Sequence, residues 1–329
     1  MTGLVKKTMQ ISAHITTDDP LVLASRASRL ALIQTEQVQR LLTPLPSRIS
    51  ELSTRGDEVL DRSLASIGGK GLFVKTLEAA MQDGRADAAV HSAKDMETRF
   101  ADGTVIAAFL EREDRRDALL GAYESIDALP QGAVVGTASV RREALLRARR
   151  PDLQIRLLRG NVQTRMQQLE DGAYDAIILA MAGLNRLSAD GISISVPFRP
   201  LSADAFMPAA AQGIIAIQAV AADGSQRRDA VLDALTALNH AATAAEARAE
   251  RALLDRLDGT CQTPVGASAH LNDGTIHLSA ALLSRDGRQR FDAEGRAAAA
   301  DAEALGHDLA NRLLDQAGGR RFLLAQDNG

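Results

Sequence analysis

Short apolar runs alternate with amphipathic segments of helical length through the first two thirds of the chain. An apolar run at 21–24 predicts a strand, and apolar positions at helical spacing over 30–41, preceded by Ser28 as N-cap, predict the helix that follows. The same alternation returns at 73–91 and between 133 and 180. Strands that alternate with helices of about ten residues are typical of parallel β/α units in open sheets.

The alternation occupies two stretches, roughly 21–110 and 115–205, which predicts two α/β lobes of similar size. Beyond them, a long helix is predicted over 241–257, and an alternating segment interrupted by Asn272-Asp273-Gly274 predicts a hairpin. The predicted fold class is α/β, with two doubly wound lobes and a smaller α+β C-terminal domain. The expected boundaries are 1–20 for a flexible N-terminal extension, 21–112 with 212–233 for the first lobe, 113–211 for the second lobe and 234–329 for the third domain.

Composition narrows the class of protein. Of 329 residues, 46% are hydrophobic and 24% are charged, as in globular proteins. A net charge of −4, 3% aromatic residues and the absence of tryptophan argue against a nucleic-acid binder. Residues 1–20 hold no apolar run of signal-peptide length, and no segment reaches the roughly 18 apolar residues of a membrane span. We therefore expect a cytoplasmic protein without a membrane partner.

Cysteine and histidine bear on metal and redox chemistry. Cys261 is the only cysteine, which excludes an internal disulfide and any cysteine-cluster metal site. The six histidines show no spacing typical of metal ligands, so we expect no metal. Cys261 lies in a turn-rich loop over 258–266, where it is either a small buried side chain or a reachable thiol for nucleophilic chemistry or covalent attachment.

Arginine supplies most of the positive charge and is concentrated over 141–165, where eight arginines stand against two acidic residues. Arg141 and Arg142 follow a predicted strand and begin the next helix, and Arg159 follows the next strand along the chain. In open α/β sheets, ligands bind beyond the carboxyl ends of the strands, where helix N-termini add positive charge. The pattern predicts a ligand with several carboxylates or phosphates. A solvated helix face and a nucleic-acid surface are the alternatives.

Two further segments carry candidate chemistry. His91-Ser-Ala-Lys-Asp95 follows another predicted strand, and its lysine and aspartate either form an ordinary surface ion pair or hold a substrate anion and move protons. The Gly- and charge-rich segment 54–71 fails the Walker A spacing around Lys70. That segment is either a lid over the cleft or an irregular loop.

Eight motifs, in order from about residue 21 to about residue 320, resemble the porphobilinogen deaminase family, whose members are also called hydroxymethylbilane synthases. Several of these motifs are five or more residues long, which makes the resemblance specific. They are Ser53–Asp57, Gly68–Phe73, His91–Asp95, Glu111–Asp114, Val135–Arg142, Leu158–Asn161, Tyr174–Ala180 and Gly259–Gly266.

The resemblance implies two lobes like those of a periplasmic binding protein and a third domain that carries the cofactor cysteine. It implies a transferase of tetrapyrrole and haem biosynthesis that joins four porphobilinogen molecules head to tail. The primer is a dipyrromethane held by a thioether to a cysteine, ammonia leaves at each addition, and hydrolysis frees hydroxymethylbilane. We therefore expect a monomer whose partner is the small molecule porphobilinogen, with no nucleic acid.

Residue by residue, the resemblance makes Asp95 the catalytic aspartate and Cys261 the attachment point of the dipyrromethane. The other residues implied in cofactor binding are Lys94, Ser139, Arg141, Arg142, Arg159 and Arg165, with Asp95 again. Substrate binding is implied for Arg26, Ser28, Arg159 and Arg186, and the lid for Arg55, Asp57 and Lys70.

The chain also departs from the family pattern. Ser66 stands where many relatives have lysine, and Thr260 and Ala211 stand where relatives have glycine. None of these positions is assigned to chemistry, so the departures bear on rates and on the conformation of the lid. The alternative function is that of a two-lobed binding protein for a polycarboxylate solute or effector.

Overall fold

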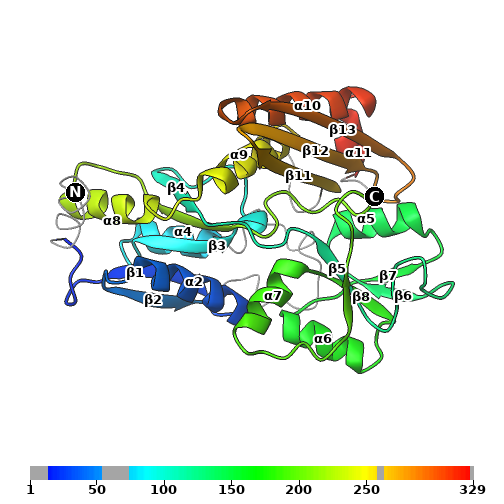
Figure 1. The fold of residues 1–329 in the computed structure, drawn as a ribbon, viewed down its shortest axis with the longest axis horizontal. Coiled ribbons are helices and arrows are strands. Elements are labelled where there is room, and N and C mark those ends of the chain that lie inside the picture. Colours follow the sequence, from blue (N-terminus) through cyan, green and yellow to red (C-terminus); the bar gives the residue numbers. More distant parts are fainter. Residues whose placement is uncertain (1–13, 54–73, 258–262, 327–329) are drawn as a thin grey trace. The chain divides into compact units, whose positions relative to one another are not determined.

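The computed structural model describes residues 14–53, 74–257 and 263–326. The chain divides into two compact units, whose helices and strands are labelled in Figure 1. The first comprises 1–59, 71–111 and 214–244, and the second comprises 60–70, 112–213 and 245–329. No helix within the described ranges is long and apolar enough to cross a membrane.

A five-stranded sheet of order β2-β1-β3-β10-β4 forms the centre of the first unit. Strands β1, β2 and β3 are parallel, whereas β10 runs antiparallel to both of its neighbours. The strands are β1 (Leu21–Arg26), β2 (Ser47–Leu52), β3 (Ala88–Ser92), β4 (Thr104–Phe109) and β10 (Ile215–Val220).

Helices bury both faces of this sheet. Leu21 and Leu23 of β1 pack in one apolar cluster with α2 (Arg29–Leu42) and α8 (Gln226–Thr236). Val22 and Ala24, which point to the opposite face, pack with α4 (Lys75–Gln82). The sheet is therefore doubly wound, as the sequence predicts.

The second unit contains a sheet of the same design, with order β7-β6-β8-β5-β9. Its strands β6, β7 and β8 are parallel, and β5 runs antiparallel to β8 and β9. Helix α5 (Val140–Arg149) packs on one face, and α6 (Val162–Glu170) and α7 (Met181–Ala189) pack on the other. The strands are β5 (Asp117–Leu120), β6 (Val134–Gly136), β7 (Gln154–Arg156), β8 (Ala176–Ala180) and β9 (Phe198–Pro200).

Each sheet contains an antiparallel strand that the sequence pattern did not predict. The predicted strands account for β1 and β3 of the first sheet and for β6, β7 and β8 of the second. The additional strands β5 and β10 are each the first strand that the chain forms after passing from one unit to the other. Because no crossover helix of their own sheet precedes them, local periodicity gives no sign of their direction. The expectation of two doubly wound lobes is confirmed, with mixed rather than all-parallel sheets.

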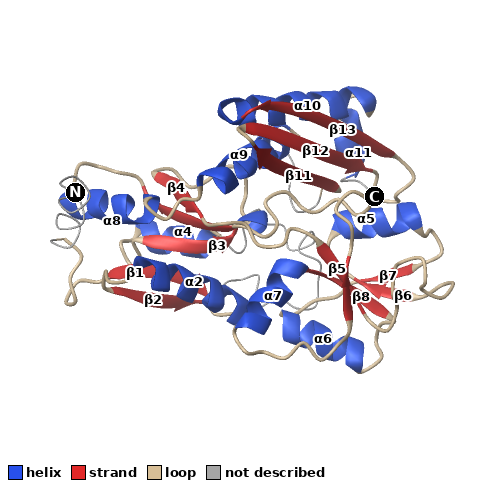
Figure 2. Ribbon diagram, in the orientation of Figure 1, coloured by secondary structure: helices blue, strands red, loops and turns tan. Residues whose placement is uncertain are grey.

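A three-stranded antiparallel sheet and helices form the C-terminal part of the second unit (Figure 2). At the predicted hairpin, Asp273 and Gly274 adopt φ angles of 47° and 75°, as a two-residue turn of type I′ requires. The apolar core includes Leu278 and Leu309. The expected α+β domain is confirmed. Its elements are α9 (Ala241–Arg256), β11 (Val265–Asn272), β12 (Thr275–Leu283), β13 (Arg290–Ala298), α10 (Ala302–Gln316) and α11 (Arg321–Gln326).

Candidate active site

In the first unit, the predicted site residues lie at the carboxyl ends of two neighbouring strands. Arg26 is the last residue of β1, and Lys94 and Asp95 belong to the short helix η2 (Ala93–Asp95) that follows β3. Because β1 and β3 are parallel partners, their carboxyl ends lie at the same edge of the sheet. All three side chains are half-buried. The structure therefore brings Arg26, Lys94 and Asp95 to one sheet edge.

Helix η2 is held on two sides. The amide of Gln34 on α2 donates to Ser92 Oγ at 2.9 Å, and Ser92 Oγ lies 3.1 Å from Gln34 Oε1. The backbone N–H of Ala93 donates to the carbonyl of Ile214 at 2.9 Å. These bonds fix the backbone that carries Lys94 and Asp95. Ser28 is the N-cap of α2, as predicted, but its side chain makes no capping hydrogen bond.

In the second unit, the predicted arginines follow the three parallel strands. Arg141 and Arg142 lie in the first turn of α5 after β6, Arg159 follows β7, and Arg186 lies on α7 after β8. Strand β5 runs antiparallel to β8, with Asp117 paired to Ala180, so β5 begins where β8 ends. The first residue of β5, Asp117, therefore lies at the same edge as the arginines.

Asp117 binds both arginines at the start of α5. Its Oδ1 accepts from Arg142 Nε at 3.1 Å and Nη2 at 2.7 Å, and its Oδ2 accepts from Arg141 Nη2 at 2.8 Å. Arg141 also donates to the carbonyl of Met207 at 2.6 Å, and Arg142 donates to that of Ile178 at 2.8 Å. Asp117 is fully buried, and the two arginines are only 4% and 7% exposed.

Counted over the described residues, this cluster carries an excess positive charge, because two guanidinium groups share one carboxylate. Burial raises the pKa of Asp117, but the charges of Arg141 and Arg142 outweigh it and hold that pKa well below its usual range. Burial lowers the pKa of Arg141, and Asp117 opposes this effect. Among the described residues, Arg141 Nε has no hydrogen-bond acceptor.

Two further predicted cations of this unit, Arg165 and Arg186, are anchored through backbone carbonyls. Arg165 donates to the carbonyl of Gly160, and Arg186 donates to that of Gly213, both at 2.7 Å. Burial lowers the pKa of Arg159 and of Arg186, and for Arg186 the charge of Glu113 opposes the shift. Ser139, by contrast, uses its side chain as the N-cap of α5, where it accepts from the backbone N–H of Arg142 at 3.4 Å.

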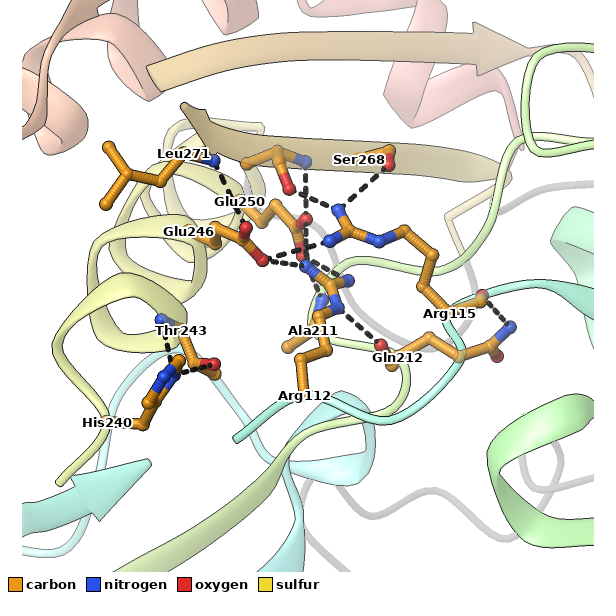
Figure 3. Close-up of polar contacts among 11 residues, drawn as sticks. Arg112, Arg115, Ala211, Gln212, His240, Thr243, Glu246, Glu250, Ser268 and Leu271 are labelled. Carbon is orange, nitrogen blue, oxygen red and sulfur yellow. Dashed lines mark hydrogen bonds and ion pairs between the residues drawn. The ribbon is translucent and has the colours of Figure 1, made fainter. Parts of the chain in front are cut away.

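A second buried ion-pair network, which the sequence did not predict, connects the second sheet to α9 (Figure 3). Arg112 donates to Glu250 at 2.7 and 3.1 Å and to Glu246 at 3.2 Å, and Arg115 donates to Glu246 at 3.1 Å. Gln212 joins this network to Asp117. Its carbonyl accepts from Arg112 Nε at 2.9 Å, and its side-chain amide donates to Asp117 Oδ1 at 2.9 Å.

The backbone conformation of Ala211 explains why the family pattern has glycine at this position. Its φ of 58° is left-handed, a conformation that costs an alanine roughly 1–2 kcal/mol. Its backbone N–H donates to Glu250 Oε2 at 2.5 Å, which ties the strained turn to α9. The strain is therefore held in place by a buried carboxylate.

Several predicted residues lie outside the described ranges. They are the cofactor cysteine and the lid residues, Cys261, Arg55, Asp57 and Lys70, together with the departures Ser66 and Thr260. Within the described ranges, no group of three or more His, Cys, Asp or Glu residues could hold a metal ion. The roles of the site residues stay predictions.

Family models match the chain over most of its length. Residues 21–228 match "Porphobilinogen deaminase, dipyromethane cofactor binding domain", and residues 244–315 match "Porphobilinogen deaminase, C-terminal domain". The chain belongs to the porphobilinogen deaminase family. A porphobilinogen deaminase from Chromobacterium violaceum is 48% identical over 313 residues, which cover 93% of this chain and 98% of that protein.

Two solved structures are more remote. The BvgS VFT2 domain of Bordetella pertussis is 15% identical, with a TM-score of 0.42, over 74% of this chain and 97% of that one. The second substrate-binding domain of a putative amino acid ABC transporter from Streptococcus pneumoniae is also 15% identical, with a TM-score of 0.39. The match covers 66% of the present chain and 93% of the transporter domain.

Proposed function

We propose that this protein acts as a porphobilinogen deaminase, also called hydroxymethylbilane synthase. This transferase joins four porphobilinogen molecules head to tail on a covalent dipyrromethane primer, releases ammonia at each addition and hydrolyses the product to hydroxymethylbilane. The observation that carries the proposal is the match of residues 21–228 to the cofactor-binding domain of this family. The 48% identical relative, which this chain covers almost completely, adds to it.

The cation cluster in the second unit fits a polycarboxylate cofactor. Each porphobilinogen-derived ring carries an acetate and a propionate, so a primer of two rings carries four carboxylates. In the described ranges, Arg141 and Arg142 are buried with one carboxylate between them, and Arg141 Nε has no acceptor. A buried cation in excess is costly unless an anion completes its pairing. The cluster is therefore suited to a carboxylate of the primer.

The residues proposed to hold the primer and the substrate are divided between the two units. Arg141, Arg142, Arg159 and Arg165, with Ser139, would bind primer carboxylates in the second unit, and Arg159 and Arg186 would bind those of the substrate. When bound, the dipyrromethane supplies a covalently held pyrrole chain to which each porphobilinogen is joined. In the first unit, Lys94 would bind a carboxylate of the primer, and Arg26 and Ser28 would bind carboxylates of the substrate.

Asp95 is the proposed catalytic residue. A carboxylate stabilises positive charge on a pyrrole nitrogen of the substrate, and it can take the nitrogen's proton and return it. The anchoring of η2 supports this role, because a fixed carboxylate stabilises developing charge without reorganising. Lys94, its neighbour in the chain, would bind a carboxylate of the primer.

We propose that Cys261 forms the thioether to the primer and that the segment bearing Arg55, Asp57 and Lys70 serves as a lid. The Gly259–Gly266 motif and the presence of a single thiol in the chain support the attachment point. We further propose a cytoplasmic monomer whose partner is porphobilinogen. Its net charge of −4 and 3% aromatic content agree with a protein that does not bind nucleic acid.

Product analysis of the purified protein with porphobilinogen tests the function. We expect four molecules of ammonia for each linear tetrapyrrole. Asp95→Ala should keep the primer and the fold but lose roughly 100-fold or more in turnover, as expected for a group that moves protons. Asp102→Ala, which removes an exposed carboxylate of the same unit, is the matched control and should leave turnover unchanged. Binding of porphobilinogen without consumption would instead support the polycarboxylate-binding protein.

A further inference from the structure

Asp117 is a buried carboxylate to which neither the motifs nor the family resemblance assigns a role. It lies at the amino end of β5 and contacts Arg141, Arg142 and Gln212. All three partners come from other elements, α5 and the segment that precedes β10. Asp117 is therefore the point where these parts of the second unit meet.

The hydrogen-bond geometry shows that Asp117 occupies the two arginines unequally. A guanidinium has five N–H donors on three nitrogens. All three nitrogens of Arg142 donate within the protein, to Asp117 and to the carbonyl of Ile178. Arg141 donates through Nη1 and Nη2, to Met207 and Asp117, and its Nε has no acceptor within the part of the chain that the structure describes. Arg142 is thus held rigidly, while Arg141 keeps an unused donor.

A purely structural role does not explain why the cluster contains two guanidinium groups for one carboxylate. One arginine would neutralise a buried carboxylate, and a second buried guanidinium beside it adds repulsion and a desolvation penalty. The unpaired charge becomes favourable once an anion joins the cluster. The cluster therefore has the composition of a carboxylate-binding site that already contains one carboxylate of its own.

We propose that Asp117 is a positioning residue that holds Arg141 and Arg142 together and leaves them one net positive charge for a carboxylate of the dipyrromethane. This inference rests on the proposed function, because Asp117 acts only through the two arginines assigned to the primer. Without the carboxylate of Asp117, the two guanidinium groups repel each other and lose their shared acceptor. The primer would then meet arginines that are displaced from their places.

Asp117→Asn tests this role, and Asp127→Asn is the matched control. Asp127 pairs with Arg149 of the same helix α5, but its side chain is 57% exposed. Intact mass gives the fraction of molecules that carry two pyrrole units, and kinetics give KM and kcat per loaded molecule. For Asp117→Asn we expect lower loading and a kcat/KM reduced by about tenfold or more, the effect of losing a charge-assisted hydrogen bond. The control should match the wild type.

A purely structural role would give a different result, since fewer folded molecules would form but each loaded molecule would keep its KM and kcat. That result, or full loading with unchanged kinetics, would overturn the proposal. If Asp117→Asn does not fold, Gln212→Met decides the question, because it removes the amide that donates to Asp117 and to the carbonyl of Arg115, and leaves the backbone carbonyl bound to Arg112. Gln212→Met should raise KM several-fold, and an unchanged KM would overturn the proposal.

The wild type separates the two proposals. A wild-type protein that carries no pyrrole adduct and forms no tetrapyrrole would contradict the proposed function itself. A wild type that is loaded and active, with an Asp117→Asn variant that equals it, would contradict only the role of Asp117.

Discussion

Replacing Glu250 by glutamine should destabilise the second unit strongly. The Glu250 carboxylate is fully buried and accepts four hydrogen bonds. Two come from Arg112, at 2.7 and 3.1 Å, and two come from the backbone N–H groups of Ala211 and Ala269, at 2.5 and 2.6 Å. Glutamine has the same shape, but one of its two oxygens becomes an NH₂ donor.

The cost follows from these contacts. Whichever way the amide is oriented, its NH₂ faces one backbone N–H and one nitrogen of Arg112, so a buried donor loses its acceptor. An unsatisfied buried donor costs about 1–3 kcal/mol, and breaking a buried ion pair costs about 3–5 kcal/mol in all. Glu246 still pairs with Arg112 and keeps the cost within that range. For a unit of about 200 residues, this lowers Tm by about 6–20 °C.

Thermal unfolding followed by circular dichroism measures the effect. Glu124→Gln is the matched control, because Glu124 binds Arg199 through two hydrogen bonds of 2.7 Å but its side chain is 73% exposed. The charge change is the same in both variants, and only burial differs. The control should unfold at the temperature of the wild type within error. A Glu250→Gln variant that also unfolds at that temperature would refute the reasoning.

Three further predictions concern backbone strain and pH. Gly287→Ala should destabilise the protein by more than about 2 kcal/mol, because an added Cβ would lie 2.5 Å from the backbone of α5. Gly274→Ala, at a glycine with a similar φ and open space around it, should cost only about 1 kcal/mol. Urea unfolding compares the two variants, and equal costs would contradict the role of the contact with α5. Ala211→Gly should stabilise by up to about 1 kcal/mol, since the relief of left-handed strain exceeds the added chain entropy, and a loss of stability in the same assay would count against this. The pKa of Asp117 is lowered in the folded protein, so the contribution of its carboxylate to the free energy of unfolding should be complete above about pH 5 and lost as the pH falls below about 4. The unfolding free energies of the wild type and of Asp117→Asn should therefore converge in acid. A gap between them that does not change with pH would exclude this contribution.

Elements with strong local patterns were predictable from the sequence. Helix α2, the long helix α9 and the 273–274 hairpin lie where periodicity and turn residues place them. Strand β2 was not predicted, because its sequence Ser-Arg-Ile-Ser-Glu-Leu is half-buried at the sheet edge and shows no apolar run. The directions of strands β5 and β10 could not be predicted from local pattern either, because they depend on where the chain enters each sheet.

The candidate site was likewise predictable only in part. Strand-end position, a local feature, predicted that Arg141, Arg142 and Asp95 would lie at the carboxyl edges of the sheets, and they do. The partners of these residues were not predictable, because Asp117 is 24 and 25 positions away from the two arginines. The signal that could have identified Asp117 is an acidic residue at the start of an apolar strand, where a buried carboxylate requires a cationic partner.

The intact mass of the freshly purified protein, with mapping of the peptide that contains Cys261, tests the central claim most directly. The account predicts an added mass equal to two porphobilinogen molecules less two ammonia molecules, located on that peptide and absent from Cys261→Ser. An unmodified mass in protein that nevertheless converts porphobilinogen to a tetrapyrrole, or an adduct on another peptide, would contradict it.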